Sequence, residues 1–280
     1  MPRYALKIAY WGEPFEGFAT QPGRLTVEGT ILDGLRRRGL AGDPPGRHLP
    51  VASRTDRGVH ALGNVVVWES SLPGEVLARV FNALDPRIAC VAWAEVGRDF
   101  HPRRASQRWY RYLETARDRD PARWARWARL FVGEHDFVHF SRHDPGHRTT
   151  RGRIQAFEVT RQGEFLVLDV RAPFFLWNQV RKMVGALHQM QEGRWDEEDL
   201  RQALQGTRRL DPPVAPAGSL ILMDVLYDLA WTPVRRGVRA QRRFFDAELE
   251  VSRLRTTLLG WMRDRMFPGS SSEEDSSAVP

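Results

Sequence analysis

Apolar and polar positions alternate with two different periods along the chain, and these periods predict strands and helices in mixed order. Residues 3–11 alternate as in a strand, whereas residues 26–39 place apolar side chains at helical spacing. The same patterns predict further strands near 63–70, 89–96, 153–160, 164–172 and 219–228, a strand within 100–114, and helices near 75–84, 122–131, 178–193 and 196–206. This mixture indicates an α/β fold.

A basic segment follows the last of these strands. It places Ala247, Val251, Leu254, Leu258 and Met262 on one face of an expected amphipathic helix. The final residues are rich in Ser and Glu, and we expect them to be disordered. The chain therefore divides into an expected N-terminal α/β domain at 1–104, a C-terminal α/β domain at 105–232, a helical extension at 233–268 and a disordered tail at 269–280.

The composition is typical of a globular protein, and the charge points to a polyanionic partner. At 280 residues with 42% hydrophobic content, the chain is long enough for two domains of ordinary size. A net charge of +7 favours binding to phosphate-rich molecules. Lys7 and Lys182 are the only lysines; arginine suits the recognition of phosphates and bases, but a GC-rich genome would produce the same preference.

Several classes of protein are disfavoured. No apolar run is long enough to span a membrane, and the first residues lack the apolar core of a secretion signal, so we expect a cytoplasmic protein without a membrane anchor. The single cysteine, Cys90, excludes an internal disulfide and any multi-cysteine metal site. The chain also lacks the Gly-x-Ser-x-Gly motif of serine hydrolases and the phosphate loop of nucleotide-binding proteins.

A series of histidines raises the question of a metal site. These residues recur every four positions, at His135, His139, His143 and His147, and on a continuous helix they would align four imidazoles. Pro145 and Gly146 interrupt the series, and no glutamate stands where a zinc protease needs its base. We therefore expect no metal to bind there.

The stretch ASRTDRGVHALG, at 52–63, places an aspartate between two arginines where a loop enters a strand. Side chains at i and i+2 of an extended segment point to the same side, so Arg54 and Asp56 can project together into one cleft. A nearby guanidinium favours the ionised form of a carboxylate, which suits a nucleophile or a base. From spacing alone, however, a structural Arg–Asp pair that holds the loop is the preferred interpretation.

The sequence as a whole reverses that preference. The segment SRTDRGVHA closely resembles the signature of the TruA family of tRNA pseudouridine synthases, and further segments match this family in order over about residues 4–228. They are FNALDPRI, FHPRRASQRWYRY, GEHDFVHF, TTRGRI, FFLWNQVRKMVGAL and DPPVAPAGSLILMDVLY. The resemblance implies the pseudouridine synthase fold, in which two mixed domains with largely antiparallel sheets, flanked by helices, meet at a basic active-site cleft.

The resemblance also implies roles for five residues. Asp56 would be the catalytic carboxylate, Arg181 its ion-pair partner and Tyr110 the platform beneath the target uracil, with a hydroxyl that assists proton removal from C5. Leu220 would pack against the other face of the base, and Arg54 would contact the RNA and help to hold the nucleotide out of its helix. The family requires no cofactor. Attack of Asp56 on the sugar, removal of a ribose proton to give a glycal, and addition to the base all stay open.

The substrate implied by the resemblance is tRNA. The expected targets are uridines at positions 38–40 of the anticodon stem-loop, and the family usually acts as a homodimer. Two alternatives stay open: a synthase that acts on another RNA, and a noncatalytic RNA-binding protein of the same fold. The presence of Asp56 argues against the noncatalytic protein, whereas nothing in the sequence excludes the other synthase.

Overall fold

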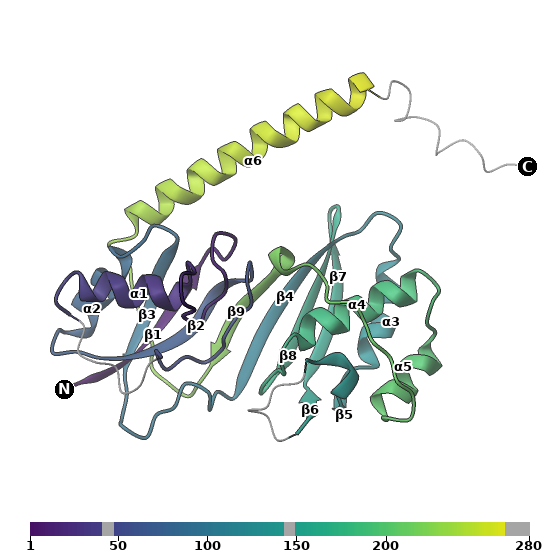
Figure 1. The fold of residues 1–280 in the computed structure, drawn as a ribbon, viewed down its shortest axis with the longest axis horizontal. Coiled ribbons are helices and arrows are strands. Elements are labelled where there is room, and N and C mark those ends of the chain that lie inside the picture. The colour runs from purple at the N-terminus through teal and green to yellow at the C-terminus, as the bar shows by residue number, and fades with distance from the viewer. Residues whose placement is uncertain (41–47, 143–148, 267–280) are drawn as a thin grey trace, which may run out of the picture.

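The computed structural model describes residues 1–40, 48–142 and 149–266, and its centre is one continuous sheet of eight strands (Figure 1). The strands are β1 (Arg3–Tyr10), β2 (His60–Glu69), β3 (Ile88–Glu95), β4 (Gln107–Thr115), β7 (Ala156–Gln162), β8 (Phe165–Ala172), β9 (Leu220–Leu226) and β10 (Thr232–Pro233). Their order in space is β10-β3-β1-β2-β9-β4-β8-β7. Every pairing in this sheet is antiparallel except β2 with β9, which is parallel.

Helices flank the sheet in two groups. They are α1 (Val27–Arg36), α2 (Gly74–Asn82), α3 (Pro121–Arg129), α4 (Gln179–Gln191), α5 (Glu197–Leu204) and α6 (Arg239–Met266). In Figure 1, α1 and α2 lie beside β1 to β3, and α3, α4 and α5 lie beside β4, β7 and β8. Their buried apolar faces pack on one hydrophobic core that joins both halves of the chain. The long α6 instead leaves the body and extends beyond it.

Local sequence signals account for where several helices begin. The Thr26 hydroxyl accepts a hydrogen bond from the Gly29 amide at 3.1 Å and so caps α1. At α5, Asp196 and Asp199 form a reciprocal capping box, each side chain accepting from the backbone amide of the other. Gly193, just after α4, has a φ of 68°, a left-handed conformation that glycine adopts without strain.

The mixed α/β fold with a largely antiparallel sheet flanked by helices is confirmed. The strand expected over 153–160 is wrong, because the segment is divided at Gln155 into β6 (Arg151–Ile154) and β7. β6 pairs with β5 (Gly133–Asp136) in a separate two-stranded sheet, whereas β7 joins the main sheet. The expected tail at 269–280 lies outside the described residues. In the part of the chain that the structure describes, no helix is long and apolar enough to cross a membrane.

The parallel pairing of β2 with β9 connects the two halves of the chain. β9 follows most of the second half in sequence, yet it lies between β2 and β4. His60, the first residue of β2, pairs with Ile221 of β9. This register brings the start of β9, Leu220, beside the loop that precedes β2. The strands of both halves therefore share one sheet, and the division into domains at 1–104 and 105–232 stays a prediction.

Candidate active site

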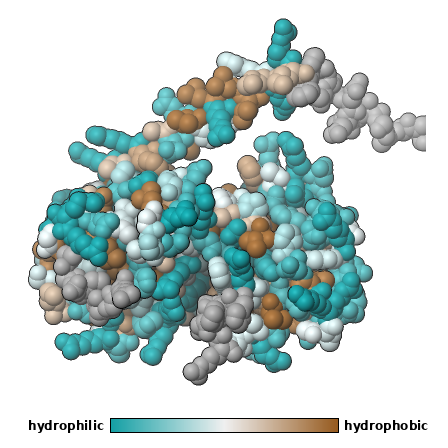
Figure 2. All heavy atoms as spheres, in the orientation of Figure 1, coloured by the Kyte–Doolittle hydropathy of each residue, from teal (hydrophilic) through white to brown (hydrophobic). Residues whose placement is uncertain are grey.

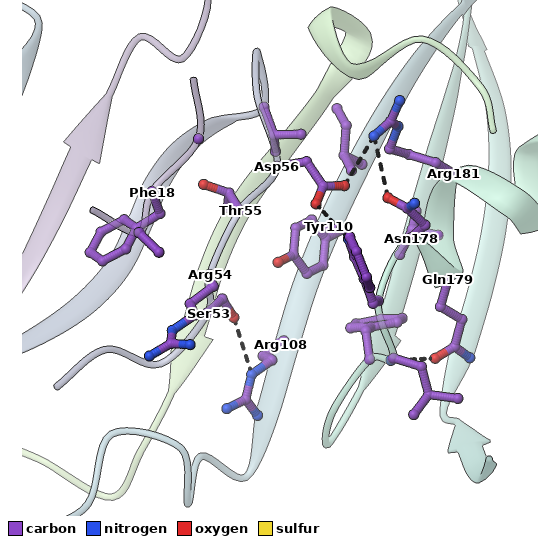
Figure 3. A pocket seen from close by; sticks show the side chains of 18 of the residues that line it. Phe18, Ser53, Arg54, Thr55, Asp56, Arg108, Tyr110, Asn178, Gln179 and Arg181 are labelled. Atoms are coloured by element: carbon purple, nitrogen blue, oxygen red, sulfur yellow. Dashed lines mark hydrogen bonds and ion pairs between the residues drawn. The ribbon is translucent and has the colours of Figure 1, made fainter. Parts of the chain in front are cut away.

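A cavity of about 610 Å³ opens where the loop before β2, strand β4 and helix α4 meet (Figure 3). All five residues predicted to form the site line it: Arg54, Asp56, Tyr110, Arg181 and Leu220. They come from the loop, from β4, from α4 and from the start of β9. The lining includes five arginines, Arg54, Arg57, Arg103, Arg108 and Arg181, against two acidic residues, Glu16 and Asp56. The cavity is therefore basic and of a size that accommodates a nucleotide.

A buried polar network fixes the loop that carries Asp56. The Asn64 side chain is fully buried; its amide nitrogen donates to the Ser53 carbonyl at 2.8 Å and to the Tyr10 hydroxyl at 3.1 Å. The Tyr10 hydroxyl in turn lies 2.7 Å from Thr55 Oγ1, and burial raises the pKa of Tyr10. Because the buried polar groups of this network satisfy one another, the loop segment just before Asp56 is held to β1 and β2.

The Asp56 carboxylate accepts hydrogen bonds from two side chains that lie far away in the sequence. Arg181 Nη1 donates to Oδ2 at 3.0 Å, and Trp177 Nε1 donates to Oδ1 at 3.1 Å. The Asp56 side chain retains 26% of its exposure. A carboxylate offers about four acceptor positions, so each oxygen keeps capacity for a ligand in the cavity. Asp56 is thus held in place without being fully occupied.

Arg181 is fixed by a second contact that leaves one end of its guanidinium for Asp56. Its Nε donates to the Ala215 carbonyl at 2.7 Å, and the Ala215 amide donates to the Arg181 carbonyl at 3.2 Å. The segment before β9 therefore clamps this side chain from outside the helix. The ion pair that the resemblance implied between Arg181 and Asp56 is present (Figure 3). Its part in catalysis stays a prediction.

The backbone turns sharply just before α4. Asn178 has a φ of 62° and is the only residue other than glycine with a positive φ in the described part of the chain. Its side chain does not cap the helix; Oδ1 instead accepts a weak hydrogen bond from Arg181 Nη1 at 3.4 Å. Asparagine tolerates this left-handed conformation better than most residues. The turn allows Trp177, before it, and Arg181, after it, to reach the same carboxylate.

Tyr110 forms one wall of the cavity. It lies on β4 and is 8% exposed, and its ring contacts that of Phe175 edge to face at 5.2 Å. Burial raises the pKa of the Tyr110 hydroxyl, while a hydrogen bond with the Ser53 side chain lowers it to a smaller degree. The hydroxyl is therefore protonated at neutral pH, and the ring is held rigidly beside the loop of Asp56.

Arg54 and Asp56 both line the cavity, but they do not pair. Arg54 is exposed, and no hydrogen bond or ion pair connects it to any of the described residues. In Figure 3 the Asp56 carboxylate points toward Arg181, whereas the Arg54 guanidinium points away from it. The extended loop thus places both side chains at one cavity, as its spacing predicts, but gives them different partners. The positive charge of Arg54 is therefore exposed at the cavity.

Three further residues shape the site, and sequence reasoning did not identify them. Trp177 and Asn178 stand directly before α4, inside the segment FFLWNQVRKMVGAL.

The third residue, His60, connects the start of β2 to the segment before β9. His60 Nδ1 accepts from the Gly12 amide at 3.0 Å, so Nε2 carries the hydrogen and donates to the Gly218 carbonyl at 3.1 Å. Burial lowers the pKa of His60, which keeps the ring neutral. His60 was visible in the motif, but its contact with the segment before Leu220 was not.

Arg108 ties three segments together beneath the cavity. Its guanidinium donates to the carbonyls of Ala52, Arg103 and Pro173, and Nε lies 3.3 Å from Ser53 Oγ. The residue is 5% exposed, and burial lowers the pKa of Arg108. Since Arg108 has no carboxylate partner among the described residues, its buried guanidinium adds positive charge beside the cavity.

The two described histidines of the series, His135 and His139, do not lie on one continuous helix. His135 is in β5, and His139 is in a 3₁₀ turn, Val138–Phe140; His143 and His147 lie outside the described residues. Among the residues that the structure describes, no group of three or more His, Cys, Asp or Glu side chains is placed to hold a metal ion.

Comparison with known proteins links this site to an RNA-modifying family. A family model described as tRNA pseudouridine synthase matches residues 127–228. A protein of Methanothermobacter thermautotrophicus named tRNA pseudouridine synthase A is 36% identical over 273 residues, which cover 94% of this chain and 98% of that protein. Proteins with the same name from Thermococcus onnurineus and Methanococcoides burtonii are each 35% identical to this chain. The match to the Thermococcus protein covers 92% of this chain and 97% of that protein. The match to the Methanococcoides protein covers 97% of this chain and 99% of that protein.

Proposed function

The chain belongs to the tRNA pseudouridine synthase A family, and we propose that it converts uridine to pseudouridine in the anticodon stem-loop of tRNA. The observation that carries this proposal is the Asp56 carboxylate, which two donors hold at the edge of a basic cavity with part of its surface exposed. Positions 38–40 are the proposed targets, as the family resemblance implies.

Access of the uridine to this cavity requires that it leave its base-paired or stacked position. A base inside a helix cannot reach an enclosed carboxylate, so the nucleotide must be turned out, at a cost of a few kcal/mol. We assign Arg54 to this step because it lines the cavity, is exposed and is unpaired among the described residues. Its guanidinium can bind a phosphate or stack on a neighbouring base.

The base then lies between two side chains. The rigid Tyr110 ring supplies one stacking surface, and Leu220, at the start of β9, supplies an apolar contact for the other. Such contacts bind the flat uracil without fixing its rotation in the plane. This freedom suits the reaction, because uracil must turn between detachment and reattachment.

The reaction is a rearrangement in which the same atoms are retained. The bond from ribose C1′ to uracil N1 breaks, the base turns, and a bond from C1′ to C5 forms; C5 loses a proton and N1 gains one. No electrons are gained or lost overall. Asp56 is the group that acts on the nucleotide, and Arg181 stabilises and orients its negative charge. The protonated Tyr110 hydroxyl, beside the same cavity, assists the transfer of the C5 proton.

We also propose that the enzyme works in the cytoplasm as a homodimer. The substrate tRNA is used there, and a dimer lets one folded RNA contact a second basic surface in addition to the cavity that receives the uridine. In this arrangement one copy supplies the catalytic cavity while its partner binds another part of the same tRNA.

The decisive experiment incubates the purified chain with tRNA transcripts and maps pseudouridine by a chemistry that marks it selectively. We expect modification of a transcript with uridine at positions 38–40, and none when cytidine replaces those uridines. Modification confined to other tRNA sites or to a ribosomal RNA fragment would instead indicate a synthase with another substrate. Binding of all these RNAs with no pseudouridine in any of them would support the noncatalytic alternative.

A further inference from the structure

The long helix α6 carries an apolar seam, which we define as Phe244, Ala247, Val251, Leu254, Leu258 and Trp261; Phe244 is half-buried and the other five residues are exposed. Steps of three and four residues alternate along it, which is the spacing of core positions in a two-stranded coiled coil. Val251, Leu254, Leu258 and Trp261 are 61%, 59%, 54% and 68% exposed. Figure 2 shows apolar surface gathered along α6, away from the body. The described part of the chain therefore leaves this seam uncovered from Ala247 to Trp261.

The body holds α6 by a different face. The Gln241 side-chain amide donates to the carbonyls of Asn82 and Ile88 at 2.8 and 2.9 Å, and the Phe245 ring contacts that of Trp11 at 6.3 Å. At 3.6 residues per turn, Gln241 and Phe245 lie roughly 120° around the helix from the seam. Packing against the body thus explains the start of α6 but not its seam.

We propose that the seam pairs with the same seam of a second copy, as an antiparallel two-stranded coiled coil. The pairing supplies an interface for the proposed homodimer and rests on that part of the proposed function, but not on the proposed chemistry. Its two-fold axis passes between Ser252 and Arg253. With this alignment, each helix covers the apolar residues that the other exposes.

The sizes of the seam residues favour the antiparallel alignment. Val251 then lies opposite the larger Leu254 of the second copy, and the small Ala247 lies opposite the larger Leu258. At each end of the pair, the Phe244 ring lies opposite Trp261 rather than Trp261 opposite itself. A core packs best when large and small side chains face one another. A parallel alignment in register would instead place Ala247 against itself, leaving a gap, and force the two Trp261 rings together.

The charges beside the seam fit the same alignment. Arg243 meets Asp264 of the second copy, and Glu248 meets Arg255 of the second copy, so each opposite-charge contact occurs twice by symmetry. Overall, α6 contains seven arginines and four acidic residues. An RNA partner would favour a helix face of uniform positive charge. An apolar seam with both signs of charge at its margins instead suits another copy of itself.

The first test measures the molar mass of the full chain in solution by light scattering or sedimentation equilibrium. We expect about twice the 32.2 kDa of one chain for the unaltered protein, and a fall to one chain for Leu254→Glu. Leu249→Glu is the matched control, because Leu249 lies on the same helix and is 54% exposed but is not part of the seam. The control should keep the mass of the dimer.

The second test joins the two helices covalently. The chain's own cysteine, Cys90, is buried, so introduced cysteines are the accessible thiols. Oxidation of a variant with both Val251→Cys and Leu254→Cys should give a disulfide-linked dimer on a non-reducing gel. Ala247→Cys alone should remain as single chains, because only the parallel alignment places position 247 against itself. A variant with Asp246→Cys and Leu249→Cys has the same spacing on another part of the helix surface and should remain as single chains.

Several outcomes would overturn the pairing. A single-chain mass for the unaltered protein removes both the homodimer and its interface, whereas a dimer that survives Leu254→Glu and forms no cross-link removes this interface alone. Loss of the dimer in Leu254→Glu overturns the antiparallel alignment if the double-cysteine variant forms no cross-link or if Ala247→Cys alone does form one. Weaker tRNA binding by Leu254→Glu at an unchanged mass would make the seam an RNA surface. Pseudouridine formation is measured on the same preparations and separates these results from a failure of the proposed chemistry.

Discussion

Two aspartates in this protein accept hydrogen bonds from an arginine and from a tryptophan, yet only one of them faces the cavity. Asp169, on β8, accepts from Arg111 Nε and Nη2, both at 2.9 Å, and from Trp109 Nε1 at 2.7 Å. Asp56 accepts from Arg181 at 3.0 Å and from Trp177 at 3.1 Å. The types of side chain are the same, but the arrangements differ.

Asp169 is engaged by three donors and is held within the sheet. Arg111 lies directly opposite it in the pairing of β4 with β8, and the contact uses both ends of the guanidinium fork. Asp56 instead receives one donor on each oxygen, because Arg181 directs its Nε to Ala215. A carboxylate with spare acceptor capacity at a cavity can act on a ligand, whereas one saturated by its neighbours stabilises the fold.

The largest expected effect separates the two carboxylates directly. Asp56→Asn should lower the single-turnover rate of pseudouridine formation by at least ~10²–10⁴-fold, because it removes the charge that acts on the nucleotide while keeping the shape. Asp169→Asn should leave that rate near its original value but lower the free energy of unfolding by about 1–3 kcal/mol, since buried donors lose their acceptor. Rapid-quench assays and denaturant titrations measure both quantities. Equal rates for Asp56→Asn and the unaltered protein would remove Asp56 as the catalyst.

The next comparison concerns the two arginines that bind these aspartates, Arg181 at Asp56 and Arg111 at Asp169. Arg181→Ala should slow the chemical step by ~10²-fold while tRNA binding changes little, because the developing charges lose a preorganised donor. Arg111→Ala, which breaks the pair on the sheet, should bind and react almost as the unaltered protein does. Single-turnover rates at saturating enzyme provide the measurement. If Arg181→Ala reacts at the original rate once tRNA is bound, the ion pair has no catalytic part.

The two tryptophans allow a finer test. Trp177→Phe keeps an aromatic ring but removes the Nε1 donor to Asp56, so the rate should fall by between ~2-fold and ~10-fold, in line with ~0.5–1.5 kcal/mol for one hydrogen bond. Trp109→Phe removes the equivalent donor to Asp169 and should affect stability without changing the rate. A rate for Trp177→Phe that matches that of Trp109→Phe would mean that Trp177 does not position the carboxylate.

The smallest expected effect belongs to Arg54, which lies two positions before Asp56 in the sequence. Arg54→Ala should weaken tRNA binding and reduce the slope of log K against log salt by up to about one unit, because one phosphate or nucleotide contact is lost. Arg36→Ala, on α1 outside the cavity and paired with Asp33 at 2.9 Å, is the control and should leave the slope unchanged. Binding isotherms over a range of salt concentrations provide the slopes. A slope for Arg54→Ala that equals the control would exclude a direct contact with RNA.

Much of the fold could be predicted because helical and strand periods are local. The helix expected over 178–193 is α4, and the strand expected over 164–172 is β8. The single strand expected over 153–160 failed, because no proline or glycine marks the break at Gln155. There the side chain instead accepts from Gln107 Nε2 at 2.9 Å, while the Gln155 amide donates to the Arg171 carbonyl at 2.8 Å. Partners on other strands decided where this segment divides.

Some residues of the candidate site could be predicted from the sequence, and others could not. The motif around Asp56 is short and distinctive, and the family resemblance assigned Tyr110, Arg181 and Leu220 to the same site. Trp177 was not identified, since its hydrogen bond to Asp56 spans 121 positions in the chain and no local pattern indicates it. Asn178 was missed for a related reason: its left-handed backbone is required only because α4 must begin where Arg181 can reach the loop.

The sequence by itself determined the periods of the strands and helices, the basic charge and the place of Asp56 in an extended loop, because each depends on residues close together in the chain. Only the tertiary structure decided which guanidinium the carboxylate binds. Arg54 is two positions from Asp56 and points away from it, whereas Arg181 is 125 positions away and lies at 3.0 Å. The reason is that β9 packs between β2 and β4 and the segment before it clamps Arg181 against the loop, and such packing depends on the whole chain.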